Sequence, residues 1–194
     1  MARQNTRETI LSIAQEMLND EGLDQVSFDG IARRLGRSKQ AVLYWFPSRQ
    51  DLLAAMFLPA LTAEAEAVET ALSKTSGRTE AVASFVNAMK GFHAENLPRF
   101  RMMYLAPQIS RAAATRQTQG DVLDQIHAVT NRTYAALAAK LDRAPDVARQ
   151  EAVAIHAAVL GLLTMLGLAD HLEDPLKHGQ DSLFDALIRS FNSP

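Results

Sequence analysis

The stretch from Ser27 to Phe46, SFDGIARRLGRSKQAVLYWF, constrains the fold more than any other part of the chain. Apolar residues at helical spacing predict two short helices on either side of Gly36, and glycine tolerates the positive φ angle that a sharp bend requires. Ser27 and Ser38 each precede one of these helices as candidate N-caps, because a serine oxygen can accept a hydrogen bond from a first-turn amide. The pattern predicts a helix-turn-helix.

The second of these helices has the features of a segment that enters a major groove. Helical spacing turns Val42, Trp45 and Phe46 toward the core and leaves Lys39, Gln40, Leu43 and Tyr44 on the opposite, outward side. Gln40 is the best candidate for reading a base, because its amide can donate and accept at once and so match an adenine edge. Between Phe28 and Gln50 there are five basic residues and one acid, a local charge of +4 in a chain of net charge −2. Such a basic segment suits contact with phosphates.

The same stretch and its flank resemble the TetR family of one-component transcriptional regulators. The DNA-binding segment of that family usually ends in a string like G-V-S-K-x-x-L-Y-x-Y-F-x-S-K-x-x-L, and Gly36 to Leu52 of this chain keep its register. The resemblance implies an all-α fold of about nine helices. It would comprise an N-terminal three-helix DNA-binding domain, residues 1–47, and a C-terminal helical ligand-binding and dimerisation domain, residues 48–194.

Three departures from the family string bear on DNA recognition. Arg37 stands where the family usually has a buried valine, so we expect it to point outward and add a phosphate contact. Leu43 takes the place of the usual tyrosine, which leaves open whether Tyr44 or Trp45 inherits its backbone contact. Asp29 lies near the start of the first motif helix, where a basic or neutral residue would approach DNA more easily, although it favours the helix dipole. The expected DNA-binding residues are Ser27, Arg37, Ser38, Lys39, Gln40, Ala41, Leu43, Tyr44 and Arg49.

Composition supports an all-helical fold and argues against metal binding and catalysis. Hydrophobic residues make up 47% of the chain and aromatic residues 6%, and no long stretch alternates with the period of a strand. There are no cysteines, and the five histidines do not follow a metal-binding spacing, so we expect no metal and no cofactor. No catalytic constellation is present, which argues against an enzyme. The N-terminus lacks an apolar signal core, which indicates a cytoplasmic protein.

Helical patterns continue through the rest of the chain. A helix that starts at Pro47 and Ser48 is expected to kink or stop briefly at Pro59. After the loop 73–79, helices are expected over 80–96, 98–105 and 121–141, with a polar break over 110–120. Their bulky and soft residues either form plain core or enclose a pocket for a small molecule, and the resemblance favours the pocket. The candidate pocket residues are Phe85, Met89, Phe92, His93, Met103, Tyr104, His127 and Tyr134.

The last two predicted helices, residues 145–170 and 182–191, have the character of an interface. From Ala152 to Ala169 no residue carries a full charge and apolar residues occur on every face, so this helix must be covered on all sides. The run is shorter and more dilute than a membrane span. The resemblance implies a four-helix interface between two copies, and the alternative is an intramolecular hairpin. The expected interface residues are Ala157, Gly161, Thr164, Leu168, Phe184, Leu187, Ile188 and Phe191.

Together these features indicate a transcriptional regulator that binds a near-palindromic double-stranded DNA operator as a homodimer. The resemblance favours a repressor that a small-molecule effector releases from DNA, although the sequence does not distinguish repression from activation. An alternative of a different class is a helical small-molecule-binding protein that has lost DNA binding. The basic cluster around the second motif helix argues against that alternative.

Overall fold

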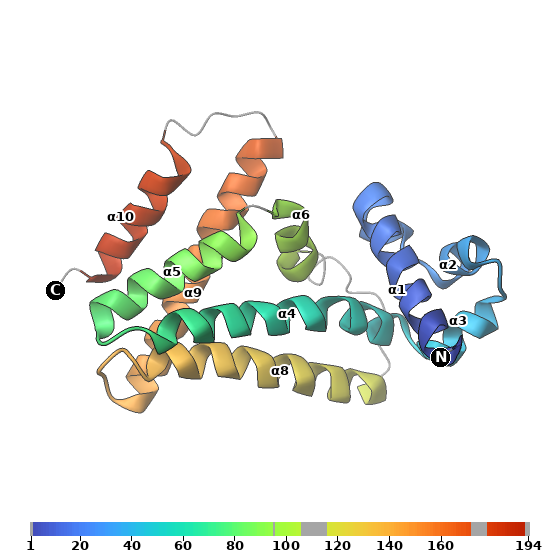
Figure 1. Cartoon of the computed structure of the whole chain (residues 1–194), viewed down its shortest axis with the longest axis horizontal. Coiled ribbons are helices and arrows are strands. Elements are labelled where there is room, and N and C mark those ends of the chain that lie inside the picture. Colours follow the sequence, from blue (N-terminus) through green and yellow to red (C-terminus); the bar gives the residue numbers. More distant parts are fainter. Residues whose placement is uncertain (1, 95, 106–115, 172–177, 193–194) are drawn as a thin grey trace. The chain divides into compact units, whose positions relative to one another are not determined.

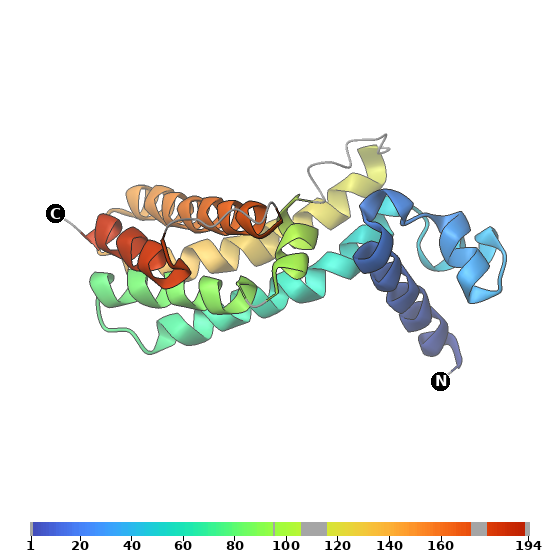
Figure 2. The same ribbon diagram turned by 90° about the horizontal axis from the view of Figure 1, so that it is seen from above.

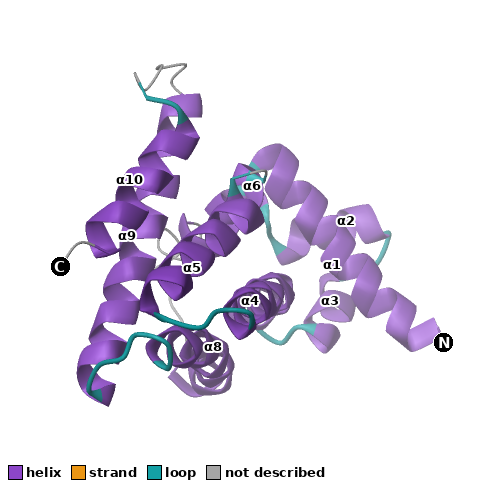
Figure 3. Ribbon diagram, turned by 60° about the vertical axis from the view of Figure 1, so that its left-hand side comes forward, coloured by secondary structure: helices purple, strands orange, loops and turns teal. Residues whose placement is uncertain are grey.

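The computed structural model of the chain describes residues 2–94, 96–105, 116–171 and 178–192. Within these ranges all regular structure is helical, which confirms the expected all-α class (Figure 3). In chain order the elements are α1 (Ala2–Glu21), a 3-10 turn η1 (Leu23–Gln25), α2 (Phe28–Leu35), α3 (Lys39–Trp45), α4 (Arg49–Ser73), α5 (Arg78–His93), α6 (Leu97–Phe100), a π turn η2 (Arg101–Leu105), α8 (Arg116–Ala138), α9 (Pro145–His171) and α10 (Gln180–Asn192).

Two of the differences from the helices that the sequence suggested have a clear physical reason. α4 runs through Pro59 without a stop, because a proline removes only one backbone donor and the turns on either side keep their hydrogen bonds. α8 begins at Arg116, so the second half of the expected polar break is helical. Glutamine and arginine are good helix formers in spite of their polarity, which explains this error. The first half of that break lies outside the described residues.

The chain divides into two compact units. The first comprises Met1–Leu61 and Arg101–His127, and the second comprises Thr62–Phe100 and Ala128–Pro194. α4 and α8 therefore contribute residues to both units. The division into functional domains at residues 47 and 48 stays a prediction.

In the first unit, α1 packs on α2, and α2 packs on α3 (Figure 1). α1 and α2 approach each other closely at Gly30, where an added Cβ would lie 2.6 Å from the terminal methyl group of Met17. At the start of α4, the Ser48 hydroxyl and the Asp51 carboxylate cap each other's backbone amides at 3.0–3.1 Å. The buried apolar residues here include Ile10, Ala14, Met17, Val26, Ile31, Ala32, Val42 and Phe46.

In the second unit, α10 packs on both α5 and α9, and α5 also packs on α9 (Figure 2). Cations of α5 hold both ends of α10. At the start of α10, Lys90 forms an ion pair with Asp181, and its Nζ lies 5.6 Å from the ring centroid of Phe184. The buried apolar residues of this unit include Ala65, Val68, Leu72, Val82, Phe85, Val86, Met89, Leu137, Leu141, Ile155, Val159, Leu163 and Phe184.

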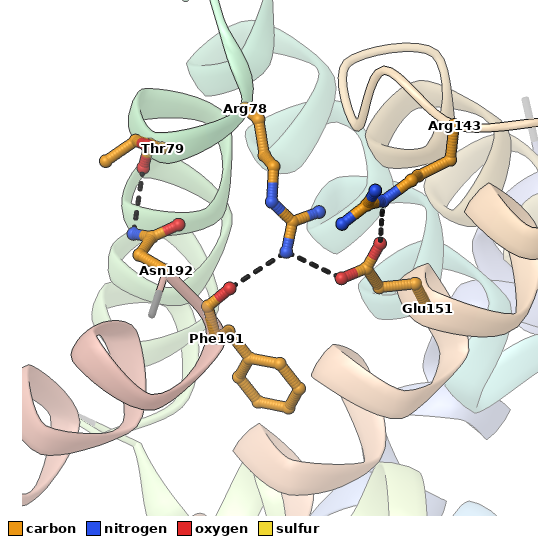
Figure 4. A network of polar contacts seen from close by, with 6 residues as sticks. All are labelled: Arg78, Thr79, Arg143, Glu151, Phe191 and Asn192. Carbon is orange, nitrogen blue, oxygen red and sulfur yellow. Dashed lines mark hydrogen bonds and ion pairs between the residues drawn. The ribbon is translucent and has the colours of Figure 1, made fainter. Parts of the chain in front are cut away.

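The other end of α10 is fastened by Arg78, the first residue of α5 (Figure 4). Its Nη2 donates to Oε1 of Glu151 on α9 at 2.6 Å and to the carbonyl oxygen of Phe191 at 2.8 Å. The Asn192 amide also donates to the carbonyl of Thr79 at 3.3 Å. These bonds join three helices at one corner and fix the surface that α9 and α10 present.

Candidate nucleic-acid interface

The bend between α2 and α3 is formed by the residues that the sequence indicated. Ser27 Oγ accepts a hydrogen bond from the Gly30 amide at 3.2 Å, and Ser38 Oγ accepts one from the Ala41 amide at 3.3 Å. Gly36 has φ 65° and ψ 33°, the left-handed conformation that ends α2. The predicted helix-turn-helix is therefore present, with both helix starts capped by serine.

α3 has one buried face and one exposed face. Val42 is 0% exposed and the adjoining Phe46 is 2% exposed, so both anchor the helix to the core. On the other side Lys39 and Gln40 are exposed, and Tyr44 is 68% exposed. This arrangement leaves an amide, a lysine side chain and an aromatic hydroxyl exposed on a single helix, as a groove-binding surface requires.

Three other expected DNA-binding residues differ in their exposure. Arg37 is exposed at the turn, and Ala41 and Leu43 are half-buried. Trp45 is half-buried and its ring lies edge-on to Tyr44, with 5.3 Å between centroids. The aromatic that is more open to solvent is thus Tyr44.

Arg49 has a structural contact that the sequence did not indicate. Its Nη2 donates to the carbonyl oxygen of Leu23 at 2.9 Å, which ties the start of α4 to η1. A phosphate contact by Arg49 would have to share or replace this hydrogen bond. Its role in DNA binding stays a prediction.

The expected pocket residues are mostly buried. Phe85, Met89 and His93 are fully buried and Met103 is 8% exposed, whereas Phe92, Tyr104 and Tyr134 are half-buried and His127 is exposed. Met103, Tyr104 and His127 belong to the first unit and the other five to the second. The pocket as a whole stays a prediction.

A buried polar pair lies among these residues in the second unit. Nε2 of His93 on α5 lies 2.6 Å from Oε2 of Glu64 on α4, and these residues are 0% and 1% exposed. The rings of Phe92 and Phe100 lie edge-on to the imidazole, with centroids 4.9 and 5.4 Å away. A carboxylate in such apolar surroundings is costly unless it is hydrogen-bonded, so this pair is a specific feature of the body.

A second buried pair links α8 and α9. Nδ1 of His156, which is 4% exposed, lies 3.2 Å from the hydroxyl oxygen of Tyr134. Burial lowers the pKa of His156, while the charge of Glu64 acts in the opposite direction. Burial likewise raises the pKa of Tyr134, and Glu64 adds to that rise. Glu64 and His156 were absent from the expected site, although a lone histidine in the uncharged run of α9 was a signal.

The lowered pKa of His156 predicts a pH dependence of stability. The folded chain binds a proton at this site less readily than the unfolded chain, so the contribution is complete above pH 6.5 and is lost as the pH falls below it. Relative to wild type, His156→Gln should therefore become progressively less destabilised between pH 7.5 and pH 5. Urea unfolding at both pH values measures this difference. His178→Gln, at an exposed histidine, is the control, and an identical change for both variants would contradict the prediction.

The expected interface residues lie on two helices. Ala157, Gly161, Thr164 and Leu168 are exposed on α9, and Leu187, Ile188 and Phe191 are half-buried on α10. Phe184 is fully buried within its own chain, where it packs as core. The surface of α9 also exposes residues that the sequence reasoning did not select, Met165 at 57% and Val153 at 41%.

Two further properties concern metals and membranes. Among the described residues, no group of three or more His, Asp or Glu side chains is placed to hold a metal ion. Within the same residues, Pro145–Ala169 of α9 is long and apolar enough to cross a membrane by length and composition alone. One such helix is weak evidence, because a core helix of a soluble protein passes the same test.

The architecture defines a class of protein, in which a helix-turn-helix at the N-terminus is joined to a helical body. Residues 10–56 match the sequence profile described as bacterial regulatory proteins, tetR family. This segment, which contains the helix-turn-helix, therefore forms a DNA-binding domain of the TetR family. The resemblance to the TetR family and the all-α fold class that the sequence indicated are confirmed.

Curated relatives agree with this assignment. The chain is 27% identical over 121 residues to the HTH-type transcriptional regulator Rv1816 of Mycobacterium tuberculosis, and equally to Mb1846 of Mycobacterium bovis. The alignment covers 61% of this chain and 52% of each relative, so the chain spans about half the length of the curated relatives it matches.

Solved structures share the fold over nearly the whole chain. SCO4313 has a TM-score of 0.78 at 17% identity and covers 100% of this chain and 98% of its own. The TetR family transcriptional regulator PfmR of Thermus thermophilus has a TM-score of 0.62 at 21% identity, over 93% and 94% of the two chains. The multidrug binding protein EbrR has a TM-score of 0.66 at 18% identity, over 97% and 96%. These similarities establish the fold.

Proposed function

We propose that this chain is a cytoplasmic transcriptional repressor that binds a near-palindromic operator as a homodimer. The observation that carries the proposal is the exposed face of α3, where Lys39, Gln40 and Tyr44 are open to solvent while Val42 is fully buried. One such helix per chain reads one half-site, and a two-fold dimer presents two of them. The capped, rigid bend supports this reading because it fixes the direction of the helix.

Substitutions at neighbouring positions on α3 test this role. Gln40→Ala should relax the base preference at one position of each half-site, because a bidentate amide contact accounts for about 1–3 kcal/mol of discrimination. Lys39→Ala should weaken binding to all sequences and flatten the dependence of affinity on salt, because it removes a phosphate contact. Fluorescence anisotropy on an operator selected from a random duplex library, and on its single-base variants, measures both effects. Equal loss on operator and random duplex for Gln40→Ala would remove it as a base reader.

We further propose that a small molecule binds the helical body and releases the DNA. Two observations support this: the Glu64–His93 and Tyr134–His156 pairs place polar groups inside an apolar body, and the structurally similar EbrR is described as a multidrug binding protein. Release requires that the effector bind the DNA-free form more tightly, and a tenfold loss of operator affinity needs about 1.4 kcal/mol of difference.

Native mass spectrometry of the purified protein tests the effector proposal. A retained compound should be detected, and adding it to the operator complex should raise the dissociation constant. A compound that binds without changing operator affinity would contradict release. A chain that binds a compound and shows no preference for any duplex would instead be a small-molecule-binding protein that has lost DNA binding.

A further inference from the structure

Lys39, the first cation of α3, forms an ion pair with an acidic residue of the neighbouring helix α2. Nζ of Lys39, the first residue of α3, lies 2.8 Å from Oδ2 of Asp29, in the first turn of α2. Both side chains are on the surface, with exposed fractions of 51% and 66%. In the described part of the chain, the nearby Arg33 and Arg37 are exposed and take part in no ion pair. Of these three cations, only Lys39, the residue before Gln40, is paired with an acid.

The position of Asp29 in α2 explains part of its presence but not this contact. A carboxylate in the first turn of a helix interacts favourably with the helix dipole. The N-cap function, however, belongs to Ser27, whose hydroxyl accepts from the Gly30 amide. The Asp29 carboxylate extends across the turn to the next helix instead, so its partner is Lys39.

We propose that Asp29 restrains Lys39 and so sets how much of DNA binding depends on phosphates rather than on bases. This inference rests on the proposed function, because it concerns the same surface of α3. A DNA phosphate that binds Lys39 must displace the Asp29 carboxylate. The free-energy cost of this exchange is small, because exposed ion pairs are weak. The carboxylate then remains close to that phosphate, within the screening length of about 8 Å at physiological salt, and repels it. Asp29 is thus a positioning residue that acts through Lys39.

The restraint has a consequence for selectivity. Sequence-independent binding is almost entirely electrostatic, whereas base reading by Gln40 uses a neutral amide. A carboxylate beside the phosphate-binding lysine therefore weakens binding to random DNA at least as much as binding to the operator. Removing its charge should increase affinity for random DNA by at least as much as for the operator, so discrimination should not improve.

Asp29→Asn tests the inference with a change of one charge and almost no change of shape. At about 100 mM salt the variant should bind random duplex roughly 3- to 10-fold more tightly than wild type, and the gain should shrink as salt rises. The slope of log affinity against log salt should steepen by up to about one ion, since removing one negative charge beside the Lys39 phosphate contact strengthens the salt-dependent part of binding. Anisotropy titrations on random duplex and on the selected operator give these values.

Two controls separate this effect from a general change in net charge. Asp20→Asn makes the same change at an exposed acid near the end of α1 and should gain little. In a Lys39→Ala background, Asp29→Asn should gain less than in the wild type, because the competition for Lys39 is gone and only the direct repulsion of the phosphate remains. No gain from Asp29→Asn, or equal gains in either control, would overturn the inference while the proposed function stands. If neither wild type nor Asp29→Asn binds any duplex, both are overturned.

Discussion

Gly161→Glu is expected to make the chain monomeric and to weaken operator binding roughly 100- to 10,000-fold, because a monomer engages one half-site without the second. The expectation rests on the exposed surface of α9, where Val153, Ala157, Gly161 and Leu168 follow one another at helical spacing. The hydroxyl of Thr164 in the same stripe donates to the Leu160 carbonyl at 2.8 Å, so its polar group is satisfied within the helix. An apolar stripe of this kind suits close packing against a second copy.

Gly161 permits a clean test because its own chain leaves the space beside it open. An added Cβ there would meet no atom within 4 Å, and glutamate has a better helix propensity than glycine. The substitution should therefore leave the protomer folded and act only on the approach of another helix. Light scattering gives the mass, and circular dichroism confirms the helical content.

Gly91→Glu is the matched control for this experiment. Gly91 is an exposed glycine within α5, and a Cβ there would also meet no atom within 4 Å. This variant should remain dimeric and bind the operator as wild type does. A dimeric Gly161→Glu at micromolar concentration, or a monomeric wild type, would contradict the interface.

The second large effect concerns the Glu64–His93 pair. His93→Leu should lower the free energy of unfolding by about 3 kcal/mol or more, because it takes a hydrogen-bond partner from a carboxylate that is 1% exposed. The double variant Glu64→Leu/His93→Leu should recover much of that loss, since replacing both members of a buried polar pair by apolar residues is often neutral. Urea unfolding of both single variants and the double variant gives the coupling energy.

An ion pair on the same helix is the control. Glu69 on α4 forms a two-pronged pair with Arg132 on α8, at 2.9 and 2.6 Å, and the two side chains are 35% and 45% exposed. Glu69→Leu should cost less than about 1 kcal/mol, because exposed pairs are weak. Two outcomes would contradict the claim that burial makes the Glu64–His93 pair important for stability. One is that the losses of unfolding free energy of the two single variants add up in the double variant, and the other is that Glu69→Leu loses as much as His93→Leu.

The helix-turn-helix could be predicted closely because its signals are local. Ser27, Ser38 and Gly36 act within a few residues of their own positions, so sequence spacing was enough to assign them. The close approach of α1 and α2 at Gly30 could not be predicted in the same way. It depends on where the Met17 side chain, 13 positions earlier, comes to lie.

The buried polar pairs of the body were beyond sequence reasoning for a similar reason. Glu64 stands in a run of alternating alanine and glutamate that is typical of a solvated helix face, yet it is buried against His93 from another helix. Which acid of such a run turns inward depends on the packing of α4 and α5, and helical periodicity alone does not specify it. Phe184 shows the same limit, since an apolar helix face can serve the core or a partner equally well.

The central claim is that α3 reads bases from an exposed face and that two copies do so on one duplex. Selection of bound molecules from a random double-stranded DNA library by the wild-type chain tests it most directly. The account predicts enrichment of one sequence with two inverted half-sites. No enrichment over the starting library by a folded, dimeric chain would contradict it, and so would enrichment of a single half-site.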